Sequence, residues 1–409
     1  MPRPYSLSNA APPPARRAAP TRPAARLRRA PPPRLSQRFD RFNLKYNPLG
    51  QSRLREIFLK TDNLLRGRYL AELTREVFAD LGGTKYSLAE YRLSIYGRAR
   101  DEWARLASWV VDNKLACPQV RWLVQVPRLY EVYRAAGTIA SFQDMLCHIF
   151  EPLFAVTLDP SSDPALHAFL SLVVGFDSVD DESKPEPRAG DDATPPPEAW
   201  RGAAQPSYAY QSYYLAANLA VLNKLRASRG MTTFSYRPHC GEAGDTDHLA
   251  AAFLTAESVN HGINLRRSTP LQYLYYLAQV GLAVSPLSNN RLFLEYQKSP
   301  FFDFFAKGLS VSLSTDDPLM LSLTREPLVE EYAVASQVWR LTPTDQCEIA
   351  RMSVLQSGFE APYKRHWLGK TYTLEGPAGN DINLTNVPDV RLQFRHECLS
   401  GERALVQQS

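Results

Sequence analysis

Short apolar runs alternate with amphipathic stretches along most of this chain. Seven runs have the length of a β-strand: Tyr91–Tyr96, Val120–Val126, Leu172–Phe176, Thr233–Arg237, Val259–Leu265, Gly281–Pro286 and Leu309–Ser314. The stretches between them carry apolar residues at helical spacing, as residues 50–80 also do. Strands that alternate with helices indicate βα units and a parallel sheet.

One intervening helix can be followed position by position. Within Ser268–Val280, a serine cap is followed by Pro270 in the first turn, and both residues favour the start of a helix. Four residues of this segment fall on one face at helical spacing: Leu271, Leu274, Tyr275 and Ala278. We therefore expect these side chains to form the apolar face of the helix.

Two of the strand-like runs alternate strictly between apolar and polar residues, namely Thr233–Arg237 and Leu309–Ser314. A central strand of an open, doubly wound sheet is apolar throughout, because helices cover both of its faces. Alternation instead favours a barrel whose strands turn polar side chains inward. By the same parity, His239 and Asp316 continue the inward faces of their runs. The predicted fold class is α/β, a (β/α)8 barrel of the TIM type.

The first 38 residues differ from the rest of the chain. Residues 1–38 hold ten prolines, nine arginines and no acid, so we expect them to be disordered. An organelle transit peptide, a polybasic tail for membrane or RNA, and a leader without function all remain open. Residues 39–409 are expected to form one domain. Within it, residues 177–207, rich in Asp, Glu and Pro, predict a long exposed loop.

Charge and cysteine content exclude several classes of protein. The formal charge is +5 over 409 residues, but residues 1–38 contribute +9, so the remainder carries −4. Nucleic acid is therefore not an expected partner of the folded part. The five cysteines lie far apart and form no Cys-x-x-Cys pair, which excludes a disulfide scaffold or a thiolate zinc finger. No apolar run reaches the length of a membrane span.

Three motifs with chemically active residues each follow a strand-like run. They are Arg237–Glu242, Asn260–Gly262 and Ser314–Pro318. The intervals between them match one and two βα units, so all three should emerge at the carboxyl rim of a barrel, where active sites of this fold lie. A lone histidine after a strand is more often structural, and Asp-Asp-Pro is often only a turn. The three together favour a functional site.

The residue types in these motifs suit metal-assisted hydrolysis. Imidazole and carboxylate groups are standard zinc ligands, and an open coordination position lowers the pKa of a bound water to about 7. His239 and Asp316 could supply such ligands. Glu242 and His261 could move protons, and Asp317 could orient the attacking water.

These motifs resemble the signature set of the adenosine/AMP deaminase family of metal-dependent hydrolases. Longer strings narrow the resemblance to AMP deaminases: FNLKYNPLGQSRLREIFLK (42–60), GMTTFSYRPHCGEAGDTDHLA (230–250) and LQYLYYLAQVGLAVSPLSNNRLFL (271–294). The similarity extends from about Phe39 to Arg395. The implied activity is hydrolytic deamination of AMP to IMP and ammonia, a step of purine salvage, with AMP and water as substrates.

The resemblance also implies a role for each site residue. His239 and Asp316 would bind one Zn²⁺, Glu242 would protonate N1 of the purine, His261 would accept a proton from the attacking water, and Asp317 would orient that water. Substrate contacts would come from Glu242, from Asp317, Pro318, Leu319 and Met320, and from Arg41, Phe42, Asn43, Leu44, Lys45 and Tyr46. Arg41 and Lys45 carry the charge that a 5′-phosphate requires.

One departure from the family pattern concerns its other two zinc ligands. The family supplies them from a His-x-His motif on the first barrel strand, whereas this sequence holds no His-x-His and no histidine before His148. The chain therefore resembles the C-terminal portion of an AMP deaminase, without the first strand. A catalytically defective, nucleotide-binding paralogue or subunit of a complete deaminase is the alternative, and adenosine is the alternative substrate.

Assembly and location follow from the same resemblance. We expect a homo-oligomer in the cytosol, with organelle targeting by residues 1–38 as the alternative. Membrane association through those residues has no further support in the sequence, because aromatic residues do not interleave the basic stretch.

Overall fold

A computed structural model describes residues 57–408, with residues 85, 185 and 187–193 left out. The predictions for residues 1–38 and for the nucleotide-contacting segment 41–46 fall outside the described residues. Within the described part, no helix has both the length and the apolar character that crossing a membrane requires.

The strands are all parallel to their neighbours and are paired in chain order. They are β1 (Ala89–Ser94), β2 (Val120–Pro127), β3 (Val173–Val179), β4 (Ser235–Tyr236), β5 (His239–Cys240), β6 (Ser258–His261), β7 (Gly281–Val284) and β8 (Val311–Leu313). Two four-stranded sheets result, ordered β1-β2-β3-β4 and β5-β6-β7-β8. The predicted α/β architecture with parallel strands is confirmed.

The predicted run Thr233–Arg237 contains β4, and Pro238 separates β4 from β5, which lies beyond the predicted run. Proline has no N–H to give to a neighbouring strand, although its carbonyl accepts from the backbone N–H of Asn260 at 2.9 Å. The next N–H, that of His239, donates to the carboxylate of Asp177 at 2.9 Å instead of to a carbonyl. Each of the seven predicted runs overlaps one strand, and β5 is a further short strand that the sequence pattern did not predict. In the part of the chain that the structure describes, nothing pairs with the outer edges of β1 and β8.

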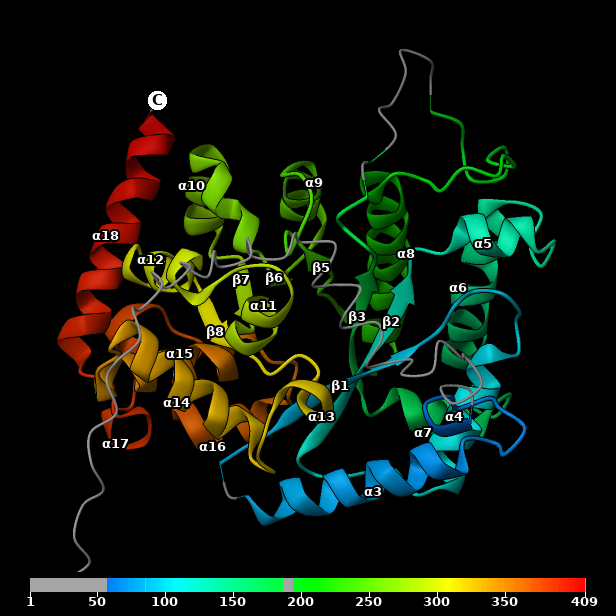
Figure 1. Cartoon of the computed structure of the whole chain (residues 1–409), viewed down its shortest axis with the longest axis horizontal. Helices are drawn as coiled ribbons and strands as arrows, with labels where there is room; N and C mark the ends of the chain where they lie inside the picture. The colour runs from blue at the N-terminus through cyan, green and yellow to red at the C-terminus, as the bar shows by residue number, and fades with distance from the viewer. Residues whose placement is uncertain (1–56, 85, 185, 187–193, 409) are drawn as a thin grey trace, which may run out of the picture. The chain divides into compact units, whose positions relative to one another are not determined.

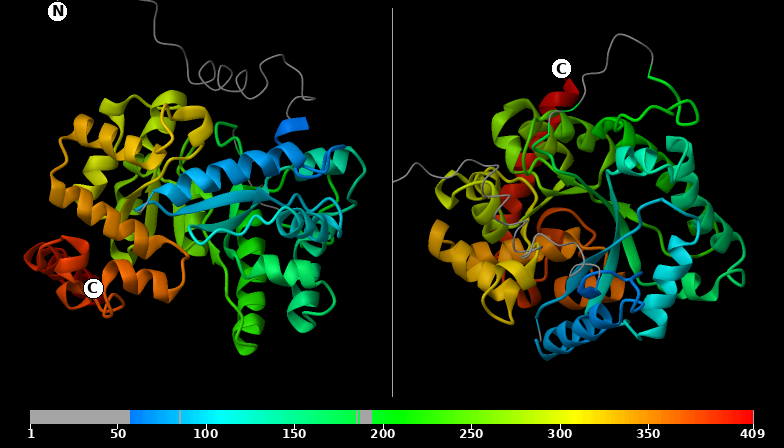
Figure 2. Two further views of the ribbon diagram at one scale, coloured as in Figure 1. Left: turned by 90° about the horizontal axis from the view of Figure 1, so that it is seen from below. Right: turned by 45° about the vertical axis from the view of Figure 1, so that its right-hand side comes forward.

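Helices follow the strands in sequence and surround them in space (Figures 1 and 2). They are α3 (Arg68–Gly83), α4 (Glu102–Asp112), α5 (Tyr130–Ala135), α6 (Phe142–Leu158), α7 (Pro164–Leu170), α8 (Tyr208–Ser228), α9 (Asp247–Thr255), η1 (Ile263–Arg267), α10 (Thr269–Ala278), α11 (Pro286–Leu292), η2 (Tyr296–Lys298), α12 (Phe301–Ala306), α13 (Pro318–Leu321), α14 (Pro327–Trp339), α15 (Pro343–Gln356), α16 (Ala361–Leu368), η3 (Gly376–Gly379), α17 (Ile382–Thr385) and α18 (Asp389–Gln408).

As the alternation in β8 predicts, its apolar and polar side chains lie on opposite faces of the strand. Val311 and Leu313 belong to an apolar core cluster, while Ser310 and Ser312 are buried on the opposite face. There the side chain of Gln356, at the end of α15, accepts from Ser312 Oγ at 2.6 Å and donates to Ser310 Oγ at 3.0 Å. Because each buried hydroxyl has a partner, the polar face costs little stability.

Several predicted boundaries are wrong. The run Val259–Leu265 ends as a strand at His261, because Gly262 adopts a φ of +65° and turns the chain into η1. The run Gly281–Pro286 ends at Val284, and Pro286 starts α11. Of residues 50–80, which show helical spacing, residues 50–56 lie outside the described residues, and a regular helix begins at Arg68.

The predicted apolar face of α10 is only partly correct. Ser268 caps the helix by accepting from the backbone N–H of Leu271, as expected, and Tyr275 is fully buried. Leu274, however, is 39% exposed, and Gln272 is buried in its place. The Gln272 amide donates to the carbonyl of Leu265 at 2.8 Å, so a satisfied polar group can occupy the buried position.

Candidate active site

Three predicted residues bring metal-ligand atoms together at the carboxyl edge of the sheet. His239 lies in β5, His261 ends β6, and Asp316 follows β8. One ligand atom from each lies within 4.8 Å of the other two. Parallel strands end at the same edge, which is why residues so far apart in sequence meet here.

The backbone is strained at two of these three residues. His261 has a φ of +70° and Asp316 a φ of +53°, values that cost free energy for residues other than glycine. After His261 comes Gly262, where an added Cβ would lie 2.8 Å from Leu282 Cδ2. The Asn-His-Gly motif therefore makes a turn that presents the imidazole at the end of β6.

Asp177, which sequence reasoning missed, orients His239. Its carboxylate lies 3.0 Å from His239 Nδ1 and 3.2 Å from Arg92 Nε. Burial raises the pKa of Asp177, but His239 and Arg92 outweigh this effect and the net shift is downward. A carboxylate on Nδ1 leaves Nε2 as the nitrogen of His239 that can bind a metal. The signal in the sequence was an acid within the otherwise apolar β3.

α11 supports Asp316 from the other side. Ser288 Oγ donates to Asp316 Oδ2. The preceding backbone N–H, of Leu287, donates to Glu331 Oε1 at 2.7 Å. Burial raises the pKa of Glu331 to about 8. The start of α11 is therefore fixed against both β8 and α14.

Glu242 and His261, the predicted proton-transfer residues, lie next to each other. Glu242 Oε1 is 3.5 Å from His261 Nδ1, and the amide nitrogen of Asn289 contacts both residues. Burial, with the charge of Asp316 adding to it, raises the pKa of Glu242 well above its ordinary value. Burial lowers the pKa of His261 to about 4. The two shifts favour the protonated form of Glu242 and the neutral form of His261.

The loop after β3 holds the turn that carries Glu242. Glu182 accepts from the backbone N–H of Gly241 at 2.6 Å and lies 3.4 Å from that of Glu242. The loop also passes close to Gly244, where an added Cβ would lie 1.9 Å from the carbonyl oxygen of Glu182. Only glycine fits at that position.

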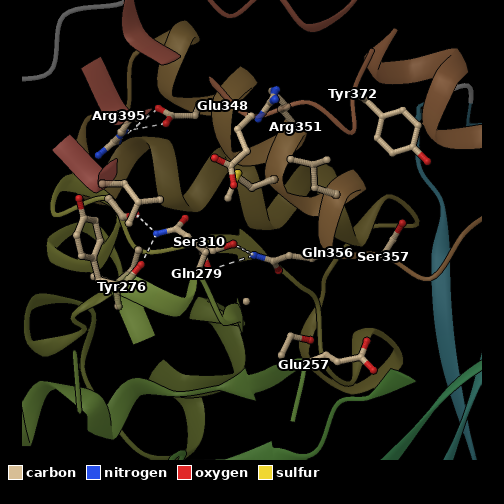
Figure 3. A pocket seen from close by; sticks show the side chains of 18 of the residues that line it. Glu257, Tyr276, Gln279, Ser310, Glu348, Arg351, Gln356, Ser357, Tyr372 and Arg395 are labelled. Atoms are coloured by element: carbon tan, nitrogen blue, oxygen red, sulfur yellow. Dashed lines mark hydrogen bonds and ion pairs between the residues drawn. The ribbon is translucent and has the colours of Figure 1, made fainter. Parts of the chain in front are cut away.

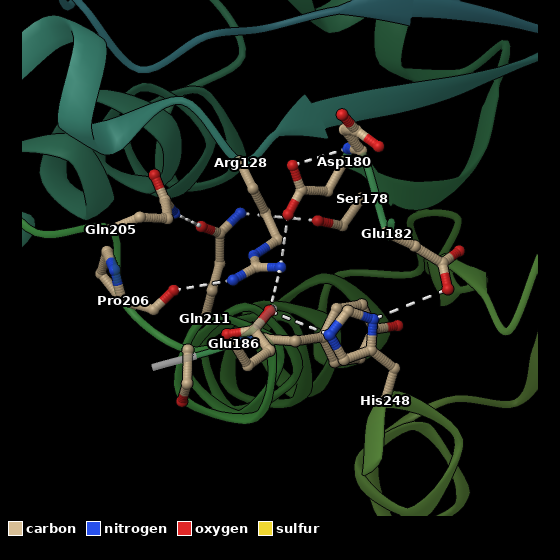
Figure 4. Close-up of polar contacts among 12 residues, drawn as sticks. Arg128, Ser178, Asp180, Glu182, Glu186, Gln205, Pro206, Gln211 and His248 are labelled. Atoms are coloured by element: carbon tan, nitrogen blue, oxygen red, sulfur yellow. Dashed lines mark hydrogen bonds and ion pairs between the residues drawn. The ribbon is translucent and has the colours of Figure 1, made fainter. Parts of the chain in front are cut away.

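Charged side chains outside the loop, Arg128 and His248, also hold it in place (Figure 4). Arg128 contacts Asp180 at 2.5 Å and Glu186 at 2.6 Å. His248 of α9 lies 2.9 Å from Glu186 and 3.6 Å from Glu182. The prediction of an exposed loop over residues 177–207 is therefore wrong for the segment around Asp180, Glu182 and Glu186. The carboxylates of this segment pair with Arg128 and His248.

The other predicted site residues occupy the rim beside the metal-ligand group. Asp317 precedes α13, which begins at Pro318, and is half-buried. Met320 is half-buried as well, whereas Leu319 is 66% exposed.

A cavity of about 920 Å³ lies at the amino ends of the strands, between Ser310, Gln356, Arg351 and the C-terminal helix (Figure 3). None of the five predicted catalytic and metal residues lines it. This cavity is therefore separate from the cluster of donor groups.

A His–His–Asp group at the carboxyl edge of parallel strands is typical of metal-dependent hydrolases. The sequence model of the AMP deaminase family matches residues 34–409. The chain belongs to this family.

Named relatives agree with that assignment. A probable AMP deaminase of Oryza sativa subsp. japonica is 61% identical over 90% of this chain and 45% of its own length. AMP deaminase of Saccharomyces cerevisiae is 57% identical over 90% of this chain and 45% of its own. AMP deaminase 1 of Homo sapiens is 53% identical over 90% of this chain and 50% of its own length. The chain thus spans about half the length of these relatives.

Among solved structures, the apo N6-methyl-AMP deaminase of Arabidopsis thaliana matches with a TM-score of 0.48. It is 15% identical, over 81% of each chain.

Proposed function

We propose that this chain carries the catalytic region of an enzyme that deaminates AMP to IMP and ammonia. The observation that carries the proposal is the group formed by His239, His261 and Asp316 beside Glu242. Identity of 53–61% to the named AMP deaminases supports AMP as the substrate.

The donor types and their arrangement fit zinc. An imidazole and a carboxylate are both ligands that zinc favours, and a catalytic zinc site keeps one position open for water. We propose His239 and Asp316 as ligands. When bound, Zn²⁺ lowers the pKa of a water ligand and so supplies a nucleophile near neutral pH.

The chain's own residues would move the protons. Glu242, whose pKa is raised by its burial, would deliver a proton to N1 of adenine as water attacks C6. His261 would accept a proton from that water, and Asp317 would orient it. Loss of ammonia from C6 then gives IMP, so one AMP and one water yield one IMP and one ammonia.

We further propose which residues hold the substrate. Pro318, Leu319 and Met320 would line the purine side, and residues 41–46 would contact the nucleotide. Arg41 and Lys45 would pair with the 5′-phosphate. This pairing would favour AMP over adenosine, the alternative substrate. A homo-oligomer and a cytosolic location are proposed on the family's pattern.

The experiment measures ammonia release from AMP and from adenosine, with bound zinc determined by elemental analysis. It uses the printed chain, alone and with a segment that supplies a His-x-His motif. Glu242→Gln should retain zinc but lower kcat by 10²-fold or more, on the order expected for a lost proton donor. Glu257→Gln, at the opposite end of the strands, is the matched control. AMP binding without turnover in either form would favour the alternative, a catalytically defective subunit.

A further inference from the structure

The cavity at the amino ends of the strands contains a buried arginine, Arg351 of α15, with few acceptors of its own (Figure 3). Arg351 is 9% exposed. Its Nε has no hydrogen-bond partner among the described residues, and its Nη2 reaches the carbonyl oxygen of Gly379 only at 3.5 Å. Burying a charged group without partners costs free energy. The guanidinium of Arg351 therefore has donors to spare for a ligand in the cavity.

Glu348, one turn earlier on α15, does not supply the missing acceptors. Arg395 Nε lies 3.0 Å from Glu348 Oε1, and Arg391 Nε contacts Oε2. Figure 3 shows the contacts between Arg395 and Glu348 as dashed lines, whereas none joins Arg351 to the residues drawn. Burial lowers the pKa of Arg351, and the charge of Glu348 opposes this shift only in part. The acid beside Arg351 is therefore committed to two arginines of α18.

Each of the other lysines and arginines that line the cavity donates to an acceptor of the protein within 3.1 Å. These pairs are Arg237 with Glu90, Lys307 with Gln272, Lys364 with the carbonyl of Leu355, Arg395 with Glu348, and Arg403 with the carbonyl of Leu277. Arg351 is thus the cavity cation whose charge is left for a ligand. One such cation matches one negative charge, and the N–H edge of a guanidinium fits the two oxygens of a carboxylate.

The remaining walls suit an apolar body attached to that carboxylate. Met352 and Leu355 lie on the same face of α15 as Arg351, and the rings of Tyr276 and Phe305 also line the cavity. Its volume of about 920 Å³ lies within the range of about 300–1,000 Å³ that is typical of sites for small organic molecules. A bare inorganic ion would leave most of this space unfilled.

We propose that this cavity is a binding site for an aromatic carboxylate, with the carboxylate paired to Arg351 and the ring among the apolar side chains. The site is distinct from the proposed active site, because none of the five proposed metal and catalytic residues lines the cavity. The inference does not rest on the proposed function, and a chain that binds the probe without deaminating AMP would leave it standing.

The first test measures binding of 2-naphthoate to the printed chain by fluorescence, with 2-naphthamide as the uncharged match. Wild type should prefer the acid by about tenfold or more, as expected for hydrogen bonds to a charged group. Arg351→Met should lose this preference, and Arg351→Lys, which keeps the charge without the planar fork, should keep part of it. Arg365→Met is the matched control, because Arg365 is exposed and does not line the cavity. Equal binding of acid and amide by wild type overturns the inference, as does an unchanged preference in Arg351→Met.

The second test separates a ligand-binding arginine from a structural one. Without a probe, the Tm of Arg351→Met should equal or exceed that of wild type, because the change removes a buried charge with few partners. Adding 2-naphthoate should raise the Tm of wild type but not that of Arg351→Met. A lower Tm of Arg351→Met without probe would assign Arg351 a structural role and contradict the inference. So would a wild-type Tm that does not respond to 2-naphthoate.

The third test asks what else could occupy the cavity. Excess AMP should not displace 2-naphthoate, because the two sites are distinct, and displacement would contradict the inference. 2-Naphthyl phosphate carries a second negative charge and should bind no more tightly than 2-naphthoate; tighter binding would show a phosphate site instead. Binding should also persist when a segment with a His-x-His motif is supplied. Its loss there would show that a protein segment fills the cavity, which overturns the proposed site.

Discussion

Neighbouring groups determine what each side chain of the site can do. His239 and His261 are both buried imidazoles, with ring centroids 5.2 Å apart. Burial lowers the pKa of His239, but Asp177 outweighs it and the net shift is upward. His261 lies 3.5 Å from the carboxyl of Glu242, but burial outweighs its neighbours and lowers the pKa of His261 to about 4. The two histidines therefore differ in their chemistry, because their neighbouring groups differ.

The first prediction concerns Asp177. Asp177→Asn should weaken zinc binding by about 10–100-fold, because the partner that orients a metal-binding imidazole typically contributes that much. Competition with a chromophoric chelator measures the affinity. Asp180→Asn is the control, since Asp180 pairs with Arg128 and not with His239. Unchanged zinc affinity in Asp177→Asn would show that the contact does not orient a ligand.

The second prediction concerns Glu182. Glu182→Ala removes the acceptor of the buried Gly241 N–H, which should cost about 1–3 kcal/mol in the free energy of unfolding. The turn carrying Glu242 should loosen, and kcat should fall by about 10–100-fold. Urea unfolding and ammonia release measure the two effects. Ser183→Ala, at an exposed neighbour, should change neither. An unchanged kcat in Glu182→Ala would mean that the turn carrying Glu242 does not need Glu182 to keep its conformation.

Pairs of elements are joined by the charges of the loop after β3. His248 of α9 faces Glu182 and Glu186 of that loop, its ring stacks on Tyr208 at 4.2 Å, and Arg128 contacts Glu186. Burial lowers the pKa of His248, but the two carboxylates outweigh it and raise it to about 9. Burial raises the pKa of Glu186, but His248 and Arg128 outweigh it and lower it to about 2.

The third prediction is the pH dependence of this junction. The pKa of His248 rises from 6.5 to about 9 on folding. Its contribution to the free energy of unfolding is therefore complete below pH 6.5 and is lost as the pH rises through 9. Glu186 stabilises above pH 4.5 and loses its effect as pH falls through about 2. The unfolding free energies of wild type and His248→Gln should therefore differ most near pH 6, by on the order of 2 kcal/mol. A difference that stays constant from pH 6 to pH 10 would contradict the assignment.

The sequence predicted what depends on strand parity, and missed what depends on how elements pack. Alternation in the strands gave inward directions for His239 and Asp316, and the βα spacing gave a shared edge with His261. Asn289 and Asp177 were missed because their contacts depend on the rotation of α11 and on how the end of β3 lies beside His239. A local sequence pattern predicts neither the rotation of a helix nor the packing of one strand beside another.

The described residues form two parallel four-stranded sheets, and none of them pairs with the outer edges of β1 and β8. Open strand edges expose N–H and C=O groups that can pair with other chains. In the AMP deaminase pattern, a strand with His-x-His stands between the corresponding strands and completes the metal site. Sheet closure and metal binding should therefore depend on the same segment.

The fourth prediction follows for the chain expressed as printed. With the two proposed ligands, His239 and Asp316, it should retain far less than one zinc after dialysis, because two ligands leave most of the coordination sphere to water. It should elute partly aggregated and release no ammonia from AMP above background. A segment supplying His-x-His should restore both zinc and turnover. Stoichiometric zinc with robust turnover in the printed chain would contradict this and make His261 the third ligand, because its nitrogen already lies within 4.8 Å of the other two donors.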